Sequence, residues 1–426
     1  MTPITQTICD GVSMLTCKDT RFHTVRLTAA AFLPLREDTA AANAMLAGLI
    51  THASAKYPDM VTLGRALSRL YGATVSAYVS RFGDHQILHF TVTCIENRYA
   101  LQGEHVVDAA VDMLLSMLFE PHLDADGLFA AEDFEQEKRC LLEQIAAEIN
   151  DKRYYARMQC DRLLADGDVY GIPIYGTADA VQALTREDVT NAWKNLLTAA
   201  KFQWVCCGES TPSTDPIAAR FATVRRAVQY GSTDTVFTSI DTPRREVCAM
   251  DVAQAKLAMG FRLSAADPDI HAVAVARLMV ALYGGTAHSL LFRHVREEKS
   301  LCYYCSAAID RVKGVMTVDS GVEPHNLDTA EQEILRQLQA VQQGDFSDEE
   351  LQAARRTVIS RLHNGENTQN GITGFYVGQS LNPVMLTPDQ TIWETQRVTR
   401  AEIMALAKTV NLQSVYTIIP QEEVAE

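Results

Sequence analysis

The chain has 426 residues, 47% of them hydrophobic and 21% charged, which is the composition of an ordinary globular protein. Its 53 Asp and Glu outnumber its 38 Lys and Arg and give a formal net charge of −15, which argues against nucleic acid and anionic membranes as partners. Ten irregularly placed cysteines are too few for a disulfide scaffold, and we find neither a secretory leader nor an uncharged apolar run of about 18 residues. We therefore expect a cytoplasmic protein with reduced thiols.

In the first half of the chain, strands are predicted to come before helices. Residues 22–35 alternate and are β-branched enough to predict a strand. Gly83 and Asp84 separate two further alternating runs, which predicts a hairpin. In chain order the predicted elements are a strand (22–35), a helix (40–56), a hairpin (71–78 and 87–95) and two helices (106–119 and 132–155).

The second half of the chain repeats this order. A hairpin is predicted around Lys313 and Gly314, and Ser347 with Glu350 forms a capping box that marks a helix start. The predicted elements are a strand (254–263), a helix (270–283), a hairpin (300–310 and 314–322) and two helices (328–343 and 347–363).

This internal similarity predicts two duplicated halves rather than a solenoid, because the repeat is about 200 residues long. Strands followed by several helices predict an α+β fold, in which each half is a mostly antiparallel sheet with helices packed on one face. We place the first half at residues 1–210 and the second at 246–426. The Ser-, Thr- and Pro-containing stretch 211–245 is the predicted linker or seam.

Two short patterns resemble metal or redox sites, but neither predicts one. His85 and His89 are spaced i, i+4, yet they lie on a predicted strand, where four residues span about 13 Å and cannot chelate as they would on a helix. Cys302 and Cys305 form a lone Cys-x-x-Cys in a predicted strand, where positions i and i+3 point to opposite faces. We interpret all of these side chains as structural.

The segment 283–304 carries the most specific pattern in the chain. Its Gly-Gly pair, Ser-x-Leu-Phe, Val-Arg-Glu and Leu-x-Tyr pieces resemble the second-half signature of the insulinase/pitrilysin family of inverted-zincin, processing-peptidase-like peptidases. The matching residues are Gly284-Gly285, Ser289–Phe292, Val295–Glu297 and Ser300–Tyr303, supported upstream by 170–177, 184–188 and 205–208. The resemblance covers nearly the whole chain and implies a clam-shell arrangement of the two halves.

The resemblance implies that Arg296 and Tyr303 bind substrate, because family members use this Arg and the Tyr seven residues later to hold the peptide backbone beside the zinc site. A guanidinium and a phenol can both donate hydrogen bonds to a peptide carbonyl. The alternative interpretation is structural: Arg296 makes a surface ion pair, and Tyr303 packs in a strand.

The zinc motif of the family, His-x-x-Glu-His, is missing from this chain. The corresponding stretch 45–54 contains one histidine, His52, and no carboxylate. Gln144 stands where the third ligand, a glutamate, is expected, with Glu143 beside it. A single histidine cannot make a three-ligand site. We therefore expect no catalytic residue, metal ligand or cofactor on this chain.

The resemblance is closest to zinc-motif-less bacterial members, which pair with a zinc-bearing paralogue. We expect a non-catalytic subunit, inactive alone, that presents Arg296 and Tyr303 to a peptide or small protein at the partner's zinc site, and that forms a homodimer when isolated. One alternative is a catalytically dead scaffold or peptide-binding protein. Another is an enzyme with a rebuilt site around His52, Glu143 and Glu148.

Overall fold

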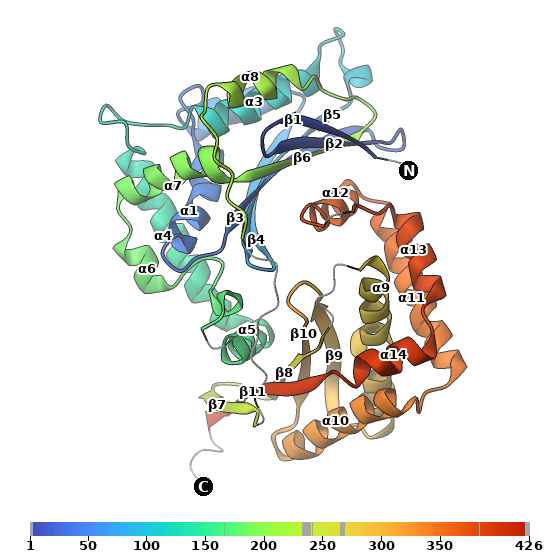
Figure 1. The fold of residues 1–426 in the computed structure, drawn as a ribbon. Coiled ribbons are helices and arrows are strands. Elements are labelled where there is room, and N and C mark those ends of the chain that lie inside the picture. Colours follow the sequence, from blue (N-terminus) through green and yellow to red (C-terminus); the bar gives the residue numbers. More distant parts are fainter. Residues whose placement is uncertain are drawn as a thin grey trace. The chain divides into compact units, whose positions relative to one another are not determined.

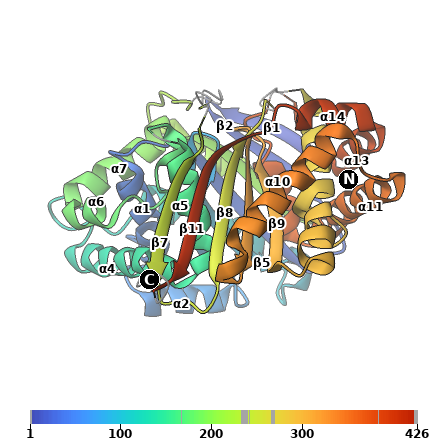
Figure 2. The same ribbon diagram turned by 90° about the horizontal axis from the view of Figure 1, so that it is seen from below.

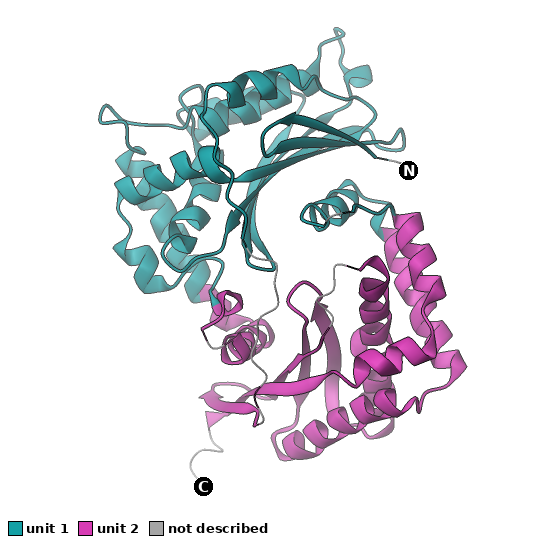
Figure 3. Cartoon of the chain, viewed as in Figure 1, with its two compact units in different colours: residues 1–146, 172–232, 365–387 teal, residues 147–171, 233–364, 388–426 magenta. Residues whose placement is uncertain are grey.

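The computed structural model describes residues 3–165, 167–231, 240, 242–264, 269–382 and 384–421. The chain divides into two compact units, each built from three separate segments (Figure 3). Unit 1 contains residues 1–146, 172–232 and 365–387, and unit 2 contains residues 147–171, 233–364 and 388–426. Of the predicted seam 211–245, residues 232–239 and 241 lie outside the described residues.

Unit 1 is built on a six-stranded sheet with the order β1-β2-β6-β3-β5-β4 (Figure 1). All neighbouring strands are antiparallel except β2 and β6. The predicted strand and hairpin of the first half are confirmed as β3, β4 and β5. The strands are β1 (Ile4–Cys9), β2 (Val12–Lys18), β3 (Thr24–Pro34), β4 (Thr74–Phe82), β5 (His85–Ile95) and β6 (Lys201–Gly208).

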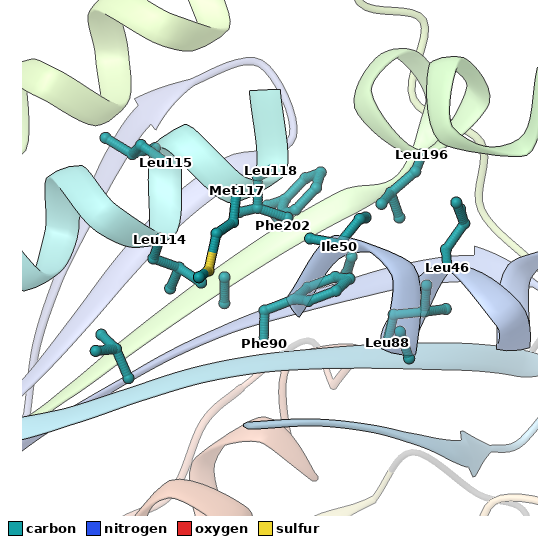
Figure 4. Close-up of a cluster of buried hydrophobic side chains, with 14 of the residues drawn as sticks. Leu46, Ile50, Leu88, Phe90, Leu114, Leu115, Met117, Leu118, Leu196 and Phe202 are labelled. Carbon is teal, nitrogen blue, oxygen red and sulfur yellow. The ribbon is translucent and has the colours of Figure 1, made fainter. Parts of the chain in front are cut away.

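One face of this sheet carries the main helical layer and the core of unit 1. Figure 4 shows Leu46 and Ile50 of α1 near Leu88 and Phe90 of β5, all of them buried. Burial of this apolar surface stabilises the unit, at about 25 cal/mol per Å². The helices of unit 1 are α1 (Ala40–His52), α2 (Met60–Arg69), α3 (Val106–Phe119), α4 (Ala131–Ala147), α6 (Ala178–Ala183), α7 (Arg186–Ala199), α8 (Asp215–Ala222) and α12 (Gln369–Val377).

Unit 2 repeats this plan with a five-stranded sheet in the order β7-β11-β8-β10-β9. Figure 2 shows β7, β11 and β8 lying side by side. Only β7 and β11 are parallel. The predicted α+β fold with duplicated halves is thereby confirmed. The strands are β7 (Arg244–Met250), β8 (Ala255–Arg262), β9 (Cys302–Asp310), β10 (Val315–Val322) and β11 (Asn411–Pro420). The longer helices are α5 (Lys152–Ala165), α9 (Ile270–Val280), α10 (Leu327–Gln343), α11 (Asp348–Gly365), α13 (Pro388–Arg397) and α14 (Arg400–Ala407).

Each sheet also receives one helix from the other half of the chain on its second face. In unit 1, α12 packs on β3 and β6. Strand alternation directs Ala30 and Phe32 of β3 toward this helix, whereas Ala29 and Ala31 face the main helical layer. In unit 2, α5 packs on β8 and β11, and its Cys160 Sγ lies 3.2 Å from Ser414 Oγ. The two compact units are therefore not continuous in sequence.

The predicted single helix 132–155 is wrong, because the chain breaks into α4 and α5. A short 3₁₀ turn, η2 (Glu148–Asn150), follows α4, and Asp151 then leaves the helical conformation. The Asp151 side chain accepts a hydrogen bond from the backbone N–H of Tyr154 at 3.0 Å. Asp is a preferred helix N-cap for this reason, so it starts α5 rather than continuing α4. The predicted capping box of Ser347 and Glu350 is confirmed by reciprocal bonds of 2.7–3.1 Å.

None of the helices in the described part of the chain combines the length and the apolar character needed to cross a membrane.

In unit 2, His271 ties the start of α9 to α13 and α14. Its ring nitrogens lie 2.8 Å from Glu394 and 3.0 Å from Glu402. Partial burial opposes protonation, but the two carboxylates outweigh it and raise the pKa of His271 above its usual value. The protonated ring therefore stabilises the fold below about pH 6.5, and this contribution is lost as the pH rises through the raised pKa.

We expect wild-type protein to lose about 1 kcal/mol of unfolding free energy between pH 6 and pH 8.5 through His271, and His271→Ala to lack this loss. Urea denaturation of both proteins at the two pH values measures the difference. An equal pH dependence in both proteins would mean that His271 does not titrate with folding.

Candidate functional site

Arg296 and Tyr303 flank a single turn of unit 2, between η5 (Leu291–Glu298) and β9. The element η5 is wound as a π-helix, a rare conformation that is frequent at functional sites. The turn is closed by a hydrogen bond of 3.0 Å from the N–H of Leu301 to the carbonyl of Val295. Ser300 adopts φ of +51°, which is uncommon outside glycine. This geometry brings the two predicted site residues onto adjoining elements.

Tyr303 lies at a β-bulge where β9 meets β10. In the register, Tyr304 pairs with Gly321 and Cys302 pairs with Val322, so Tyr303 has no partner position. A bulge re-aims side chains in this way and is common beside active sites. The exposed fraction of Tyr303 is 52%, whereas both neighbouring positions are more buried.

The bulge also corrects the prediction that Cys302 and Cys305 point to opposite faces. Both side chains are buried in the same core cluster, because the extra residue shifts the alternation by one position. The neighbouring Cys305 thiol lowers the pKa of the Cys302 thiol through a hydrogen bond, and this effect outweighs partial burial. The ten cysteines are all free.

Arg296 and Tyr303 each have an acidic neighbour. The guanidinium of Arg296 stacks 4.6 Å from the ring centroid of Phe292, and its Nε lies 3.5 Å from Glu297 Oε1. The side chain of Arg296 remains 41% exposed. The Tyr303 hydroxyl donates a short hydrogen bond to the Glu323 carboxylate. That bond raises the pKa of Tyr303, so the phenol keeps its proton at neutral pH.

Glu333 of α10 holds the turn between η5 and β9 in place through Lys299. This residue was not identified from the sequence. Its buried carboxylate accepts a hydrogen bond of 2.6 Å from Lys299, a residue of the turn, and further bonds from Arg336 and Gln337. Burial opposes its charge, but these three donors outweigh burial and lower the pKa of Glu333 to about 2. A glutamate on the apolar face of a helix, one position before Ile334, was the available signal.

A cavity of about 630 Å³ is lined mainly by η5 and α11. Phe292, Arg293 and Glu297 line it from η5, and Glu350 and Arg356 line it from α11. Arg293 Nη1 donates a hydrogen bond of 2.8 Å to Glu350 Oε1, and both residues line the cavity. The Phe292 ring, on which Arg296 stacks, therefore also lines a cavity large enough for a substrate side chain.

The α1 region does not fit zinc. His52 is the last residue of α1, and Glu143 and Gln144 are exposed on α4. The carboxylate of Glu137 packs against α1 instead, and it fills the space that a side chain at Gly48 would occupy. Burial raises the pKa of Glu137, and nearby His52 partly opposes this shift.

No group of three or more His, Cys, Asp or Glu side chains within the described ranges could hold a metal ion. Glu148 belongs to unit 2, whereas His52 and Glu143 belong to unit 1. His85 and His89 have structural partners: His85 accepts a hydrogen bond from Gly231, and His89 stacks on Tyr78 at 4.1 Å. The residues of the rebuilt-site alternative therefore form no metal site in the described part of the chain.

Comparison with known proteins gives consistent matches over most of the chain. The family described as "Peptidase M16 inactive domain" matches residues 183–358. A Bacillus subtilis (strain 168) protein named "Probable inactive metalloprotease YmfF" is 26% identical over 410 residues, which is 95% of each chain.

Solved structures with the same fold include a conserved protein from Enterococcus faecalis, with a TM-score of 0.86 and 24% identity over 98% of both chains. A protease from Helicobacter pylori has a TM-score of 0.78 and 12% identity over 98% of this chain and 99% of its own. A peptidase M16 inactive domain from Pseudomonas fluorescens has a TM-score of 0.76 and 13% identity over 99% and 98%. At these identities the likeness concerns the fold alone.

Proposed function

Because this chain is a homologue of the M16 peptidases, as its sequence pattern predicted, and lacks their zinc motif, we propose that it is a non-catalytic subunit that holds peptide for a zinc-bearing partner. In this proposal the partner is a paralogue of the same family, and the substrate is a peptide or small protein. The observation that carries it is the exposed Arg296 and Tyr303 pair on an ordered turn, in a chain whose α1 carries no zinc motif.

The chemistry of the pair suits the backbone of an extended peptide. Arg296 offers a fork of N–H donors, oriented by Phe292, to a peptide carbonyl. Tyr303 offers a neutral O–H donor when its hydrogen bond to Glu323 is exchanged for one to the peptide. At a partner's zinc site such donors would stabilise the negative charge that develops on the carbonyl oxygen. The cavity beside Phe292 gives a neighbouring substrate side chain a place to bind.

A scaffold or peptide-binding protein of the same fold is the second candidate. It is favoured by the acidic neighbours of the pair, because Glu323 already accepts the Tyr303 hydroxyl and Glu297 lies beside Arg296. The Bacillus subtilis relative is also named as probably inactive. In this role the chain would bind its partner or a peptide without contributing to hydrolysis.

The proposal includes a cytoplasmic location, which ten free thiols suit. It also includes a homodimer in the absence of the partner, since apolar surface meant for a partner promotes self-association. Light scattering after size exclusion tests whether the chain alone is a homodimer. The same measurement on a mixture with a zinc-motif paralogue from the same genome tests for a heterodimer. We expect the mixture to elute as a one-to-one heterodimer. Two unmixed peaks would count against the subunit proposal and leave the scaffold role.

Glu323→Gln is expected to strengthen peptide binding about threefold to tenfold, because a neutral amide accepts the Tyr303 hydroxyl less strongly than a carboxylate does. Anisotropy of a labelled peptide with the heterodimer measures this affinity. Asp328→Asn is the charge-matched control, since Asp328 is exposed at the start of α10 and should change nothing.

The gain should vanish when Glu323→Gln is combined with Tyr303→Phe, because the released donor is then absent. A double variant that keeps the gain would show that Glu323 acts through its charge alone, and Tyr303 would lose its proposed role.

A further inference from the structure

A second cavity in unit 2 lies on the free edge of β9 and is separate from the one beside Phe292. Its volume is about 410 Å³, and α9, α11, β9 and the π-helical segment η4 (Ala281–Gly285) line it. Most of the lining is apolar and includes Val280, Ile309, Val358 and Leu362. The only charged residues of the lining are Arg277 and Arg361. A volume in this range suits a small organic molecule.

Arg277 carries a charge that nothing in the described chain compensates. Its Nη1 is buried without a hydrogen-bond partner, and no hydrogen bond or ion pair among the described residues involves its guanidinium. Burial, together with the like charge of Arg311, lowers the pKa of Arg277 to about 10, so the side chain remains cationic at neutral pH. Buried charges in proteins are normally paired, because an isolated one is costly.

Arg361 adds a second cation at the exposed side of the same cavity. Its Nη2 donates a hydrogen bond of 2.6 Å to the carbonyl of Gly285, which holds the side chain over the lining. Its other guanidinium donors have no partner among the described residues. Two arginines therefore line a cavity whose remaining walls are apolar.

We propose that this cavity binds a carboxylate joined to an apolar body, with the carboxylate on Arg277 and Arg361 and the hydrocarbon on Val280, Ile309 and Leu362. A guanidinium fork matches a carboxylate in a bidentate geometry. The apolar walls disfavour a compact, fully hydrated anion such as inorganic phosphate. The same chemistry occurs in a free aliphatic acid and in the C-terminal residue of a peptide that ends in an apolar side chain.

Titration calorimetry and thermal unfolding with five probes test this site on the full chain. The probes are octanoate, octanamide, the acid and amide forms of N-acetyl-Ala-Ala-Leu, and inorganic phosphate. We expect at least one acid to bind and to raise the unfolding temperature, with its amide at least tenfold weaker. The acid that binds identifies the source of the ligand. Binding of acid and amide with equal affinity, of neither acid, or of inorganic phosphate as tightly as of the acids would overturn the proposal.

Arg277→Met should weaken binding of the acid at least tenfold and should fold at least as stably as wild type without ligand, because it removes an uncompensated buried charge. Arg361→Met at the exposed side provides a second test and should also weaken binding. Arg397→Met is the matched control, since Arg397 is an exposed arginine of α13 that lies outside the linings of both cavities. Undiminished affinity in both test variants would contradict the site.

Discussion

Replacing Arg296 with alanine is expected to lower kcat/KM of the proposed heterodimer about 100-fold while leaving the fold intact. A charge-assisted hydrogen bond to a developing oxyanion is worth about 2.7 kcal/mol or more, which corresponds to this factor. The local cost of the change is small, because Arg296 is partly exposed and its ion pair with Glu297 is 3.5 Å long. Initial rates on a fluorogenic peptide and urea unfolding of the variant measure the two effects.

Arg397→Ala is a closely matched control for this change. Arg397 stacks 4.2 Å from the ring of Trp393, four residues earlier, and its Nη1 lies 3.5 Å from Glu394. Arg296 has the same surroundings in Phe292 and Glu297, so the two variants remove the same kinds of contact. We expect Arg397→Ala to retain full activity. Equal loss of activity in both variants would mean that the effect of Arg296 is structural.

Replacing Glu333 with glutamine is expected to lower the unfolding free energy by about 3 kcal/mol at pH 7. The side chain is 4% exposed, and its pKa of about 2 lies well below the usual glutamate value of about 4.5. Each unit of this difference corresponds to about 1.4 kcal/mol. The loss includes the anchor of Lys299, so the turn between Arg296 and Tyr303 should also become less ordered.

The pH dependence of this difference follows from the direction of the pKa shift. A lowered carboxylate pKa stabilises the fold above the unfolded value, and the contribution fades as the pH falls toward the folded value. The gap between wild type and Glu333→Gln should therefore shrink as the pH falls from about 4.5 toward 2. Glu349→Gln, at an exposed position of α11, should show almost no gap. Urea unfolding at pH 7, 4.5 and 3 measures all three proteins, and a constant gap would contradict the assigned cause.

Local sequence signals predicted most of the elements of each half. The alternation of β3, the apolar helix α9 and the Ser347 capping box follow from interactions between residues close in sequence, so they could be read directly. The break at Asp151 was missed because apolar spacing continues across it, although an N-cap residue stands there. The exchange of α5 and α12 depends on long-range packing, which no local pattern records.

The candidate site was also predictable only in part from the sequence. The spacing of Arg296 and Tyr303 and the loss of the zinc motif are properties of the sequence alone. The bulge at Tyr303 changes which face each residue takes, and simple alternation therefore misplaced Cys302 and Cys305. The acidic partner Glu323 and the anchor Glu333 lie 20 or more residues further along the chain, so only the folded structure associates them with this turn.

A peptidase assay combined with metal analysis decides whether this chain holds peptide for a partner's zinc site. The assay compares this chain alone, the zinc-motif paralogue alone, and their mixture with wild-type or Arg296→Ala protein. We expect this chain alone to be metal-free and inactive, and we expect the mixture to cleave peptides only when Arg296 is present. Stoichiometric zinc and activity in this chain alone, or a mixture no more active than the paralogue, would contradict this role.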